Sequence, residues 1–111
     1  MKYALLVYSE PGAHDLPEEE MGAVLRDYEA IRDEPGYLGS AQLHPAEMAT
    51  TVRRKDGQTL TTDGPFADTK EVFGGYYVFD VDNVDRALEI AERIPAIRLG
   101  GSVEVRPVMG A

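Results

Sequence analysis

The sequence predicts an α+β domain with a ferredoxin-like, split βαβ arrangement, in which both helices lie on one face of an antiparallel sheet. Two observations predict this fold class. Strand-like and helical segments follow one another in the order β-α-β-(hairpin)-β-α-β. Both helical segments carry the same apolar stripe, and each follows a strand that is apolar on both faces. A chain of 111 residues has the length of one domain, which we place at residues 1–111.

The first strand is predicted at Tyr3 to Tyr8, a continuous apolar run whose two faces are both expected to be covered. The run is too short for a signal peptide or a membrane span, so we expect no membrane association. The turn at Glu10 to Gly12 ends the strand.

The first helix is predicted from about Leu16 to Asp33. Pro17 suits a first helical turn, and the acidic residues 18–20 complement the positive end of the helix dipole. Its apolar stripe consists of Met21, Val24, Leu25, Tyr28 and Ile31. Pro35-Gly36 breaks the helix, and a strand is expected from Tyr37 to Leu43.

A polar hairpin is predicted next. The segments Thr50 to Lys55 and Gln58 to Thr62 flank Asp56-Gly57, a strong signal for a two-residue hairpin turn.

The last third of the chain predicts a strand at Tyr76 to Val81, a helix and an edge strand. Asp82 or Asn83 is expected to cap the helix, and Pro95 to end it. The stripe predicted for this helix consists of Val84, Ala87, Leu88, Ala91 and Ile94. Residues 103–107 alternate as a half-buried edge strand does, and an edge tolerates Pro107.

One face of this sheet has no helix to cover it. Tyr3, Leu5 and Val7, or their neighbours, must lie on that face together with apolar residues of the strand at 76–81. Because soluble monomers rarely expose a large apolar patch, we predict a homodimer with the two sheets packed face to face, a dimeric α+β barrel. The alternative is that loops 12–16 or 46–50 fold over the face.

Composition excludes several classes of function. The formal net charge of −9 argues against binding nucleic acid. The absence of cysteine excludes disulfides and thiol catalysis and fits a reducing compartment, so we expect a cytoplasmic protein. The sequence has no dinucleotide-binding, P-loop, zincin or nucleophile-elbow motif. We therefore predict no metal and no cofactor.

Asp63 is the first candidate for catalysis. It follows a threonine run and precedes Gly64-Pro65, which would hold its backbone in one conformation. A rigidly placed carboxylate is suited to act as a general base. Alternatively, Asp63 is a turn former whose side chain accepts backbone N–H bonds two residues further on.

The second candidate for catalysis is His44, because imidazole transfers protons near neutral pH. Alternatively, His44 is an exposed loop residue before a proline. The other histidine, His14, lies in a turn-rich loop and is expected to be solvated.

Arg53 and Tyr76 are the candidate substrate-binding residues. Arg53 belongs to a run of three basic residues and would bind a carboxylate or phenolate, although hairpin charges more often protect an edge strand. A Tyr76 hydroxyl that reaches a cavity would serve as an acid. The expected ligand is therefore small and anionic or aromatic. Lys70 and Glu71 are expected to form a surface ion pair.

Three motifs carry a resemblance to a known family. Residues 63–71 read Asp-Gly-Pro-Phe-Ala-Asp-Thr-Lys-Glu, residues 74–77 read Gly-Gly-Tyr-Tyr, and residues 103–107 read Val-Glu-Val-Arg-Pro. With these motifs the chain resembles, over nearly its whole length, the DGPF branch of the YCII-related proteins.

The resemblance implies a dimeric α+β barrel with a cavity in each subunit, and elimination on an oxygenated ring by a His–Asp pair. It also implies an association with sigma factors of the extracytoplasmic-function class. Asp63 matches the family's aspartate. The family's histidine lies on the first helix, and residues 21–26 here contain none. Either His44 substitutes for it or the dyad is missing.

Three functions follow from these patterns. The first is a small-molecule lyase or isomerase in which Asp63 moves a proton, His44 relays it and Arg53 holds the substrate. The second is a non-catalytic regulatory module that acts on a sigma factor. The third is a dimer whose motif supports the interface alone. Fold analogy does not decide among them.

Overall fold

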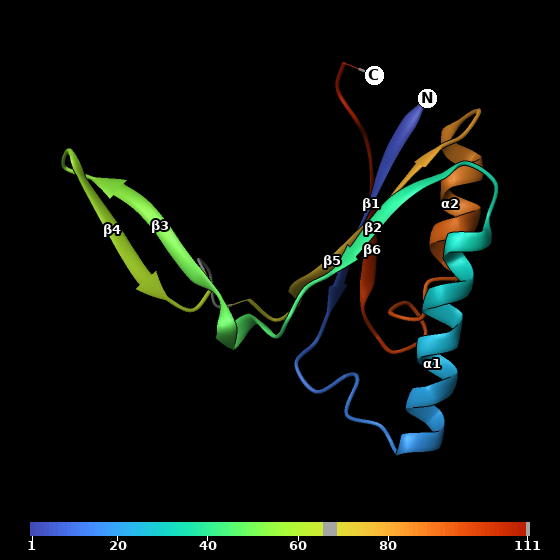
Figure 1. Cartoon of the computed structure of the whole chain (residues 1–111), viewed down its shortest axis with the longest axis horizontal. Coiled ribbons are helices and arrows are strands. Elements are labelled where there is room, and N and C mark those ends of the chain that lie inside the picture. Colours follow the sequence, from blue (N-terminus) through green and yellow to red (C-terminus); the bar gives the residue numbers. More distant parts are fainter. Residues whose placement is uncertain (66–68, 111) are drawn as a thin grey trace.

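Two helices cover one face of a four-stranded antiparallel sheet, and a two-stranded hairpin stands apart from both (Figure 1). The computed structural model describes residues 1–65 and 69–110. The strands are β1 (Lys2–Ser9), β2 (Tyr37–Gln42), β3 (Thr50–Lys55), β4 (Gln58–Asp63), β5 (Val72–Asp80) and β6 (Ser102–Pro107). The helices are α1 (Glu18–Ala30) and α2 (Val84–Glu92), with short 3₁₀ turns η1 (Ile31–Asp33) and η2 (Ala46–Met48).

The sheet has the predicted split βαβ topology. Its strand order is β2-β5-β1-β6, and every neighbouring pair is antiparallel. Strands β1 and β2 therefore run in the same direction with β5 inserted between them, as in a ferredoxin-like fold. The predicted fold class is confirmed for the single chain, and the dimer stays a prediction.

The core lies between the sheet and the helices. Tyr3, Leu5 and Val7 of β1 are buried, as are Tyr77 and Phe79 of β5. In the antiparallel register Tyr3 faces Phe79 and Leu5 faces Tyr77, so these side chains share the helical face. Alternate residues of both strands consequently point to the opposite face.

Helix α2 corrects one detail of the predicted pattern. The Asn83 side chain accepts a hydrogen bond of 3.1 Å from the Arg86 N–H, as predicted for the cap. However, Val84 and Leu88 are 44% and 45% exposed, whereas Ile90 is fully buried. The buried residues of α2 are Ala87, Ile90 and Ala91, and Ile94 is buried just after the helix, so the buried stripe is rotated from the predicted one.

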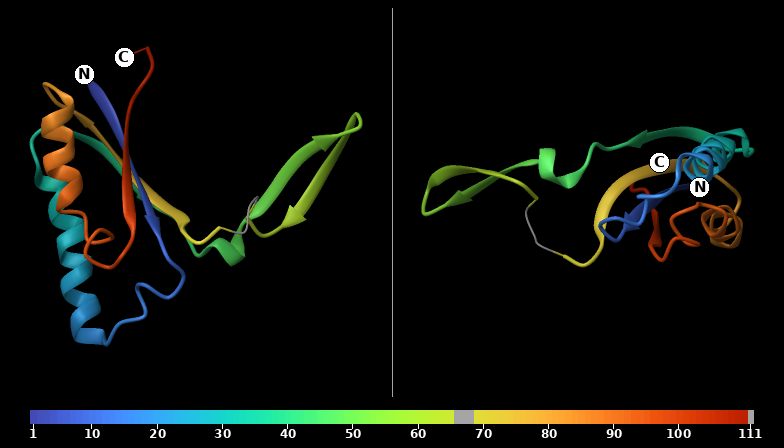
Figure 2. Two further views of the ribbon diagram at one scale, coloured as in Figure 1. Left: turned by 180° about the vertical axis from the view of Figure 1, so that it is seen from behind. Right: turned by 90° about the horizontal axis from the view of Figure 1, so that it is seen from below.

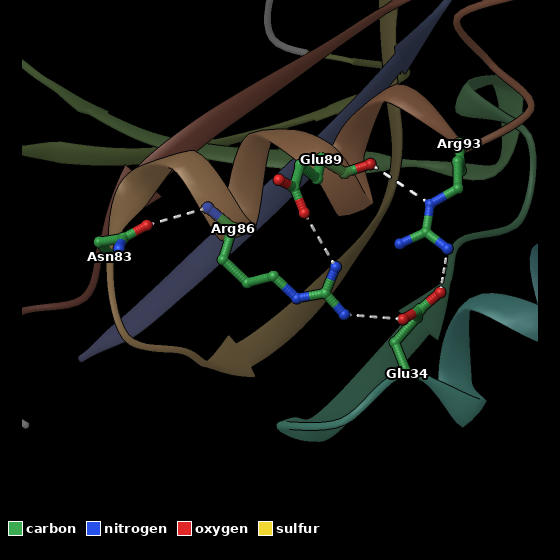
Figure 3. Close-up of polar contacts among 5 residues, drawn as sticks. All are labelled: Glu34, Asn83, Arg86, Glu89 and Arg93. Atoms are coloured by element: carbon green, nitrogen blue, oxygen red, sulfur yellow. Dashed lines mark hydrogen bonds and ion pairs between the residues drawn. The ribbon is translucent and has the colours of Figure 1, made fainter.

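An ion-pair cluster ties the chain before β2 to helix α2 (Figure 3). The Glu34 carboxylate accepts a hydrogen bond of 2.9 Å from Arg86 and a second from Arg93. Arg86 also donates to Glu89 at 3.2 Å. The hydrogen bond from Arg93, followed by that from Arg86, lowers the pKa of Glu34. The cluster therefore joins the end of η1 to helix α2.

The hairpin β3–β4, which we call the arm, forms as predicted around Asp56-Gly57. Both turn residues have positive φ, 52° and 76°, as a type I′ turn requires. In both figures the main sheet lies between the helices and the arm (Figures 1 and 2). The radius of gyration of 15.8 Å exceeds the value of about 13 Å typical of this chain length, because the arm projects.

The Gly74-Gly75 pair provides a test of the β2–β5 contact. A Cβ at Gly75 would lie 2.6 Å from the Ala41 carbonyl oxygen of β2, whereas a Cβ at Gly74 would meet nothing within 4 Å. We expect Gly75→Ala to force β2 away from β5 and to cost about 1–3 kcal/mol in unfolding free energy. Gly74→Ala is the matched control and should leave the thermal midpoint unchanged or slightly raised. Equal losses in both variants would contradict the close approach at Gly75.

Candidate functional site

The face of the sheet away from the helices is lined by apolar and aromatic side chains. We call it the open face, and it consists of Ala4, Leu6 and Tyr8 of β1 with Phe73, Tyr76 and Val78 of β5. These residues form the cross-strand pairs Ala4–Val78, Leu6–Tyr76 and Tyr8–Phe73. Phe73 and Tyr76 are 37% and 36% exposed, which is high for large aromatic side chains on a central strand.

The aromatic rings of the open face have a defined arrangement. The Tyr8 and Phe73 ring centroids are 5.5 Å apart at an interplanar angle of 57°. A β-bulge after Val7 brings these two residues opposite each other. Tyr76 lies between Leu6 and the small Ala41 of β2, so β2 places no bulky side chain opposite the Tyr76 ring. Rings exposed in this way are suited to stacking against a flat ligand.

Polar groups border the open face on the β6 side. Arg106 donates to the Glu104 carboxylate at 2.6 and 3.2 Å. This hydrogen bonding raises the pKa of Arg106, and the proximity of Tyr8 adds to the effect. The Ser102 hydroxyl donates to Glu71 at 2.8 Å. The border therefore offers one cation, two carboxylates and a hydroxyl close to the aromatic rings.

Asp63 ends β4 at the base of the arm and is exposed. The residue two positions further on is Pro65, which has no N–H for an Asp side chain to bind. Other groups hold the turn: the Gly64 N–H donates to the Ala49 carbonyl at 2.7 Å, and the Thr51 hydroxyl donates to the Gly64 carbonyl at 2.8 Å. Among the described residues, the Asp63 carboxylate has no hydrogen bond or ion pair.

The other three predicted site residues lie in different places. His44 is exposed just after Leu43, whose N–H donates to the Gly74 carbonyl at 2.9 Å. Within residues 1–65 and 69–110, no hydrogen bond or ion pair joins His44 to Asp63. Arg53 pairs with Leu60, so strand alternation places it on the face of the arm opposite to Asp63. Tyr76 lies on the open face.

For these four residues, the described contacts of a single chain show no link between Asp63 and His44, and place Arg53 and Asp63 on opposite faces of the arm. Their assigned roles in catalysis and substrate binding stay predictions. Residues 66–68 of the nine-residue motif lie outside the described residues.

The predicted ion pair between Lys70 and Glu71 is wrong. Lys70 lies 3.5 Å from Glu10, and Glu71 accepts the hydrogen bond from Ser102. Glu71 immediately precedes β5, and each of the two side chains is held by a partner from another segment. The two contacts tie the chain before β5 to the residue after β1 and to the start of β6.

The solvated environment predicted for His14 is also wrong. Its Nε2 lies 2.8 Å from the Tyr28 hydroxyl of α1, and the two rings stack at 5.8 Å. The Tyr28 carbonyl accepts a hydrogen bond of 2.8 Å from Tyr77. Burial lowers the pKa of His14, raises the pKa of Tyr28 and raises the pKa of Tyr77 to about 12. No sequence periodicity links His14 to Tyr28, so the sequence carried no signal for this contact.

The His14 contact also bears on the alternative that loop 12–16 folds over the open face. Because His14 binds Tyr28, loop 12–16 is held against α1, on the helical side of the sheet. The second candidate loop, 46–50, contains η2 and leads into the arm. Phe73 and Tyr76 remain exposed with both loops in place.

Two surface hollows lie in the helical layer. One is lined by Asp27, Glu34, Arg93 and Arg98 among others, and these four charges are already paired, Arg98 with Asp27 at 2.8 Å and Arg93 with Glu34. Neither this hollow nor a second one beside Arg26 includes a predicted site residue.

In the described residues no three His, Asp or Glu side chains are placed to hold a metal ion. No helix there is long and apolar enough to cross a membrane.

Comparisons with known proteins place these features in context. A family model for the YCII-related domain matches residues 1–110. An uncharacterised protein of Rhizobium meliloti (strain 1021) is 40% identical over 114 residues, which cover 97% of this chain and 92% of that protein.

One solved structure shares the fold. It is 5-chloro-2-hydroxyhydroquinone dehydrochlorinase (TftG) from Burkholderia phenoliruptrix AC1100, in complex with 2,5-dihydroxybenzoquinone. It matches with a TM-score of 0.55 and 14% identity, over 100% of this chain and 96% of that chain. At this identity the likeness concerns the fold alone.

The environment of Asp63 predicts that its charge contributes little to stability. We expect Asp63→Asn to change the unfolding free energy by less than about 0.5 kcal/mol at neutral pH. Asn83→Ala, which removes the α2 cap, is the reference and should cost about 1 kcal/mol. Thermal unfolding of both variants beside the unchanged protein measures the difference. A loss at Asp63→Asn as large as that of Asn83→Ala would mean that the carboxylate holds the turn.

The His14–Tyr28 contact predicts a pH dependence of stability. The pKa of His14 is lowered from its ordinary value of 6.5, so the unfolded chain takes up a proton at this site before the folded chain does. Stability should therefore fall as pH decreases from about 7 to about 5. We expect His14→Gln to show a smaller fall in thermal midpoint over this range. His44→Gln is the control and should behave like the unchanged protein. Identical curves for His14→Gln and His44→Gln would contradict the assignment.

Proposed function

Because the chain belongs to the YCII-related family, we propose that it is a small-molecule enzyme, a lyase or isomerase that binds a flat, oxygenated ring against its open face. The observation that carries this proposal is the exposure of Phe73 and Tyr76, beside the half-buried Tyr8, on a sheet face bordered by Arg106. Aromatic side chains exposed together on a sheet are a costly surface for a soluble protein unless a ligand or partner covers them.

The substrate class follows from the chemistry of this surface. Exposed aromatic rings favour a planar ligand, and Arg106 favours oxygen substituents that carry negative charge. The Burkholderia dehydrochlorinase is named as a complex with a dihydroxybenzoquinone, a compound with both properties. Arg53 is a second cation that would serve the same purpose if the arm approaches a ring.

Asp63 is proposed to move the proton. In an elimination from the keto tautomer of such a ring, the Asp63 carboxylate takes a proton from a ring hydroxyl and the O–H electrons form a carbonyl. The neighbouring ring double bond then shifts, and the leaving group departs from the saturated ring carbon with its own bonding pair. In an isomerisation, the proton returns at another position. Because the turn at Gly64 is held by Thr51 and Ala49, the carboxylate is available for this role. His44 is the proposed relay, and the Tyr76 hydroxyl is the proposed acid.

The regulatory alternative, an association with a sigma factor, stays a prediction that no contact or surface of the described residues favours. A cytoplasmic location is part of the proposal, because a chain without cysteine suits a reducing compartment.

The proposal predicts that 2,5-dihydroxybenzoquinone binds to the protein in a saturable manner, measured by calorimetry. Tyr76→Ala should weaken binding about tenfold through the loss of ring stacking. Leu88→Ala, on the exposed side of α2, is the control and should not change the affinity.

The proposed catalysis by Asp63 is tested separately, by measuring the release of chloride from 5-chloro-2-hydroxyhydroquinone. Asp63→Asn should retain quinone binding and lose at least about a hundredfold in turnover. Absence of binding by the unchanged protein would defeat the substrate class. Equal turnover by Asp63→Asn would remove Asp63 from the mechanism.

A further inference from the structure

Strand β6 carries a pair of opposite charges at the border of the open face. In the antiparallel register Glu104 pairs with Leu6 of β1, and Arg106 pairs with Ala4. Residues paired across two strands share a face, so both charged side chains belong to the open face. Strand β6 is the outermost strand on this side of the sheet. The pair therefore lies at the rim of the aromatic surface.

The two side chains hold each other through a single carboxylate oxygen. Nε and Nη2 of Arg106 donate to Oε2 of Glu104, at 3.2 and 2.6 Å respectively. Among the described residues, neither side chain makes any other hydrogen bond or ion pair. Oε1 of Glu104 is therefore left as an acceptor, and Nη1 of Arg106 is left as a donor. The ion pair holds this donor and this acceptor in one arrangement.

The guanidinium of Arg106 leans toward the aromatic rings. The hydrogen bonds to Glu104, and after them the proximity of Tyr8, raise the pKa of Arg106. Tyr8 lies four residues along β1 from Ala4, the residue that pairs with Arg106. The Arg106 side chain must therefore run along the sheet toward Tyr8 to be close to it.

The space over Leu6 connects the charged pair with Tyr76. Leu6 pairs with Glu104 on one side and with Tyr76 on the other. Neighbouring strands lie about 4.8 Å apart, so about 10 Å separates Glu104 from Tyr76 across Leu6. One substituted ring lying over Leu6 would fill this distance, with its oxygens toward β6. The small side chain of Ala4 leaves room on the same face beside Arg106.

We infer that Glu104 and Arg106 together recognise a ring with two adjacent oxygens, one ionised and one protonated. Nη1 of Arg106 donates to the oxyanion, and Oε1 of Glu104 accepts a hydrogen bond from the neighbouring hydroxyl. Because the donor and the acceptor belong to one ion pair, the two ligand oxygens have to lie on neighbouring ring carbons. The inference rests on the proposed binding of a ring at the open face and names its substrate class more closely.

The monoanion of a catechol-type ring matches both protein groups. A phenolate without a second hydroxyl matches Arg106 alone and leaves the Glu104 carboxylate without a donor. A carboxylate ligand places a second negatively charged oxygen against Glu104, which is unfavourable. The pair therefore distinguishes ligands that Arg106 by itself would bind equally.

The test compares 4-nitrocatechol with 4-nitrophenol, which differ by one hydroxyl beside the ionising oxygen. The nitro group lowers the pKa of both compounds, so that both carry an oxyanion near neutral pH, and their absorbance reports binding. We expect the unchanged protein to bind 4-nitrocatechol about tenfold more tightly, because a hydrogen bond to a charged acceptor is added.

Two variants assign this preference to the pair. In Glu104→Gln the amide oxygen faces Arg106 and the amide N–H groups face the ligand, so the preference for 4-nitrocatechol should be lost while 4-nitrophenol still binds. Arg106→Gln should weaken binding of both compounds about tenfold. Exposed ion pairs contribute little to stability, so both variants should fold, which thermal unfolding checks.

The matched control is Glu89→Gln. The Glu89 carboxylate also accepts a hydrogen bond from an arginine, Arg86 at 3.2 Å, but it lies on α2 on the helical side of the sheet (Figure 3). This variant should bind both compounds as the unchanged protein does.

Two results would overturn the inference. One is equal affinity of the unchanged protein for the two nitro compounds, and the other is a preference for 4-nitrocatechol that persists in Glu104→Gln. Binding of 2,5-dihydroxybenzoquinone separates these failures from failure of the proposed function. If the quinone binds and the nitro compounds bind equally, the inference fails and the proposed function stands. If none of the three compounds binds, both fail.

Discussion

The pairing of β1 with β5 is the constraint on which the rest of the structure depends. Because side chains alternate along a strand, the register that sets Leu5 opposite Tyr77 on the helical face also sets Leu6 opposite Tyr76 on the open face. A slip of one residue would exchange the two sets. The same pairing that builds the core therefore builds the aromatic surface on which the candidate site rests.

The two faces differ in what covers them rather than in how apolar they are. On one side the helical layer buries Tyr3, Leu5 and Phe79. On the other side Phe73 and Tyr76 remain more than a third exposed. An apolar surface that the chain builds but does not cover has a free-energy cost in the monomer, so a ligand, a second copy or both would lower the free energy by covering it.

Much of the fold was predictable from local patterns, because the capped helix α2, the Asp56-Gly57 hairpin and the continuous run of β1 each depend on near neighbours in sequence. The misses involve contacts between distant segments. Nothing near His14 in the sequence indicates that Tyr28 will bind it. The buried stripe of α2 was predicted to include Val84 and Leu88, but the structure buries Ile90 instead. Helical spacing alone does not determine which side of a helix faces its sheet. The direction of the arm depends on the segments that join it to the sheet.

The motif that begins at Asp63 does not force a choice between the two roles that are alternatives in the sequence. If Asp63 shaped the turn, its carboxylate would be consumed and unavailable for chemistry. In the structure Gly64 adopts a φ of 98°, its N–H binds Ala49 and its carbonyl binds Thr51, so the turn is held without the Asp63 side chain. The turn residues thus orient the arm, and the carboxylate beside them is left for a ligand or a partner. A motif can be structural in its backbone and still be chemical in its side chain.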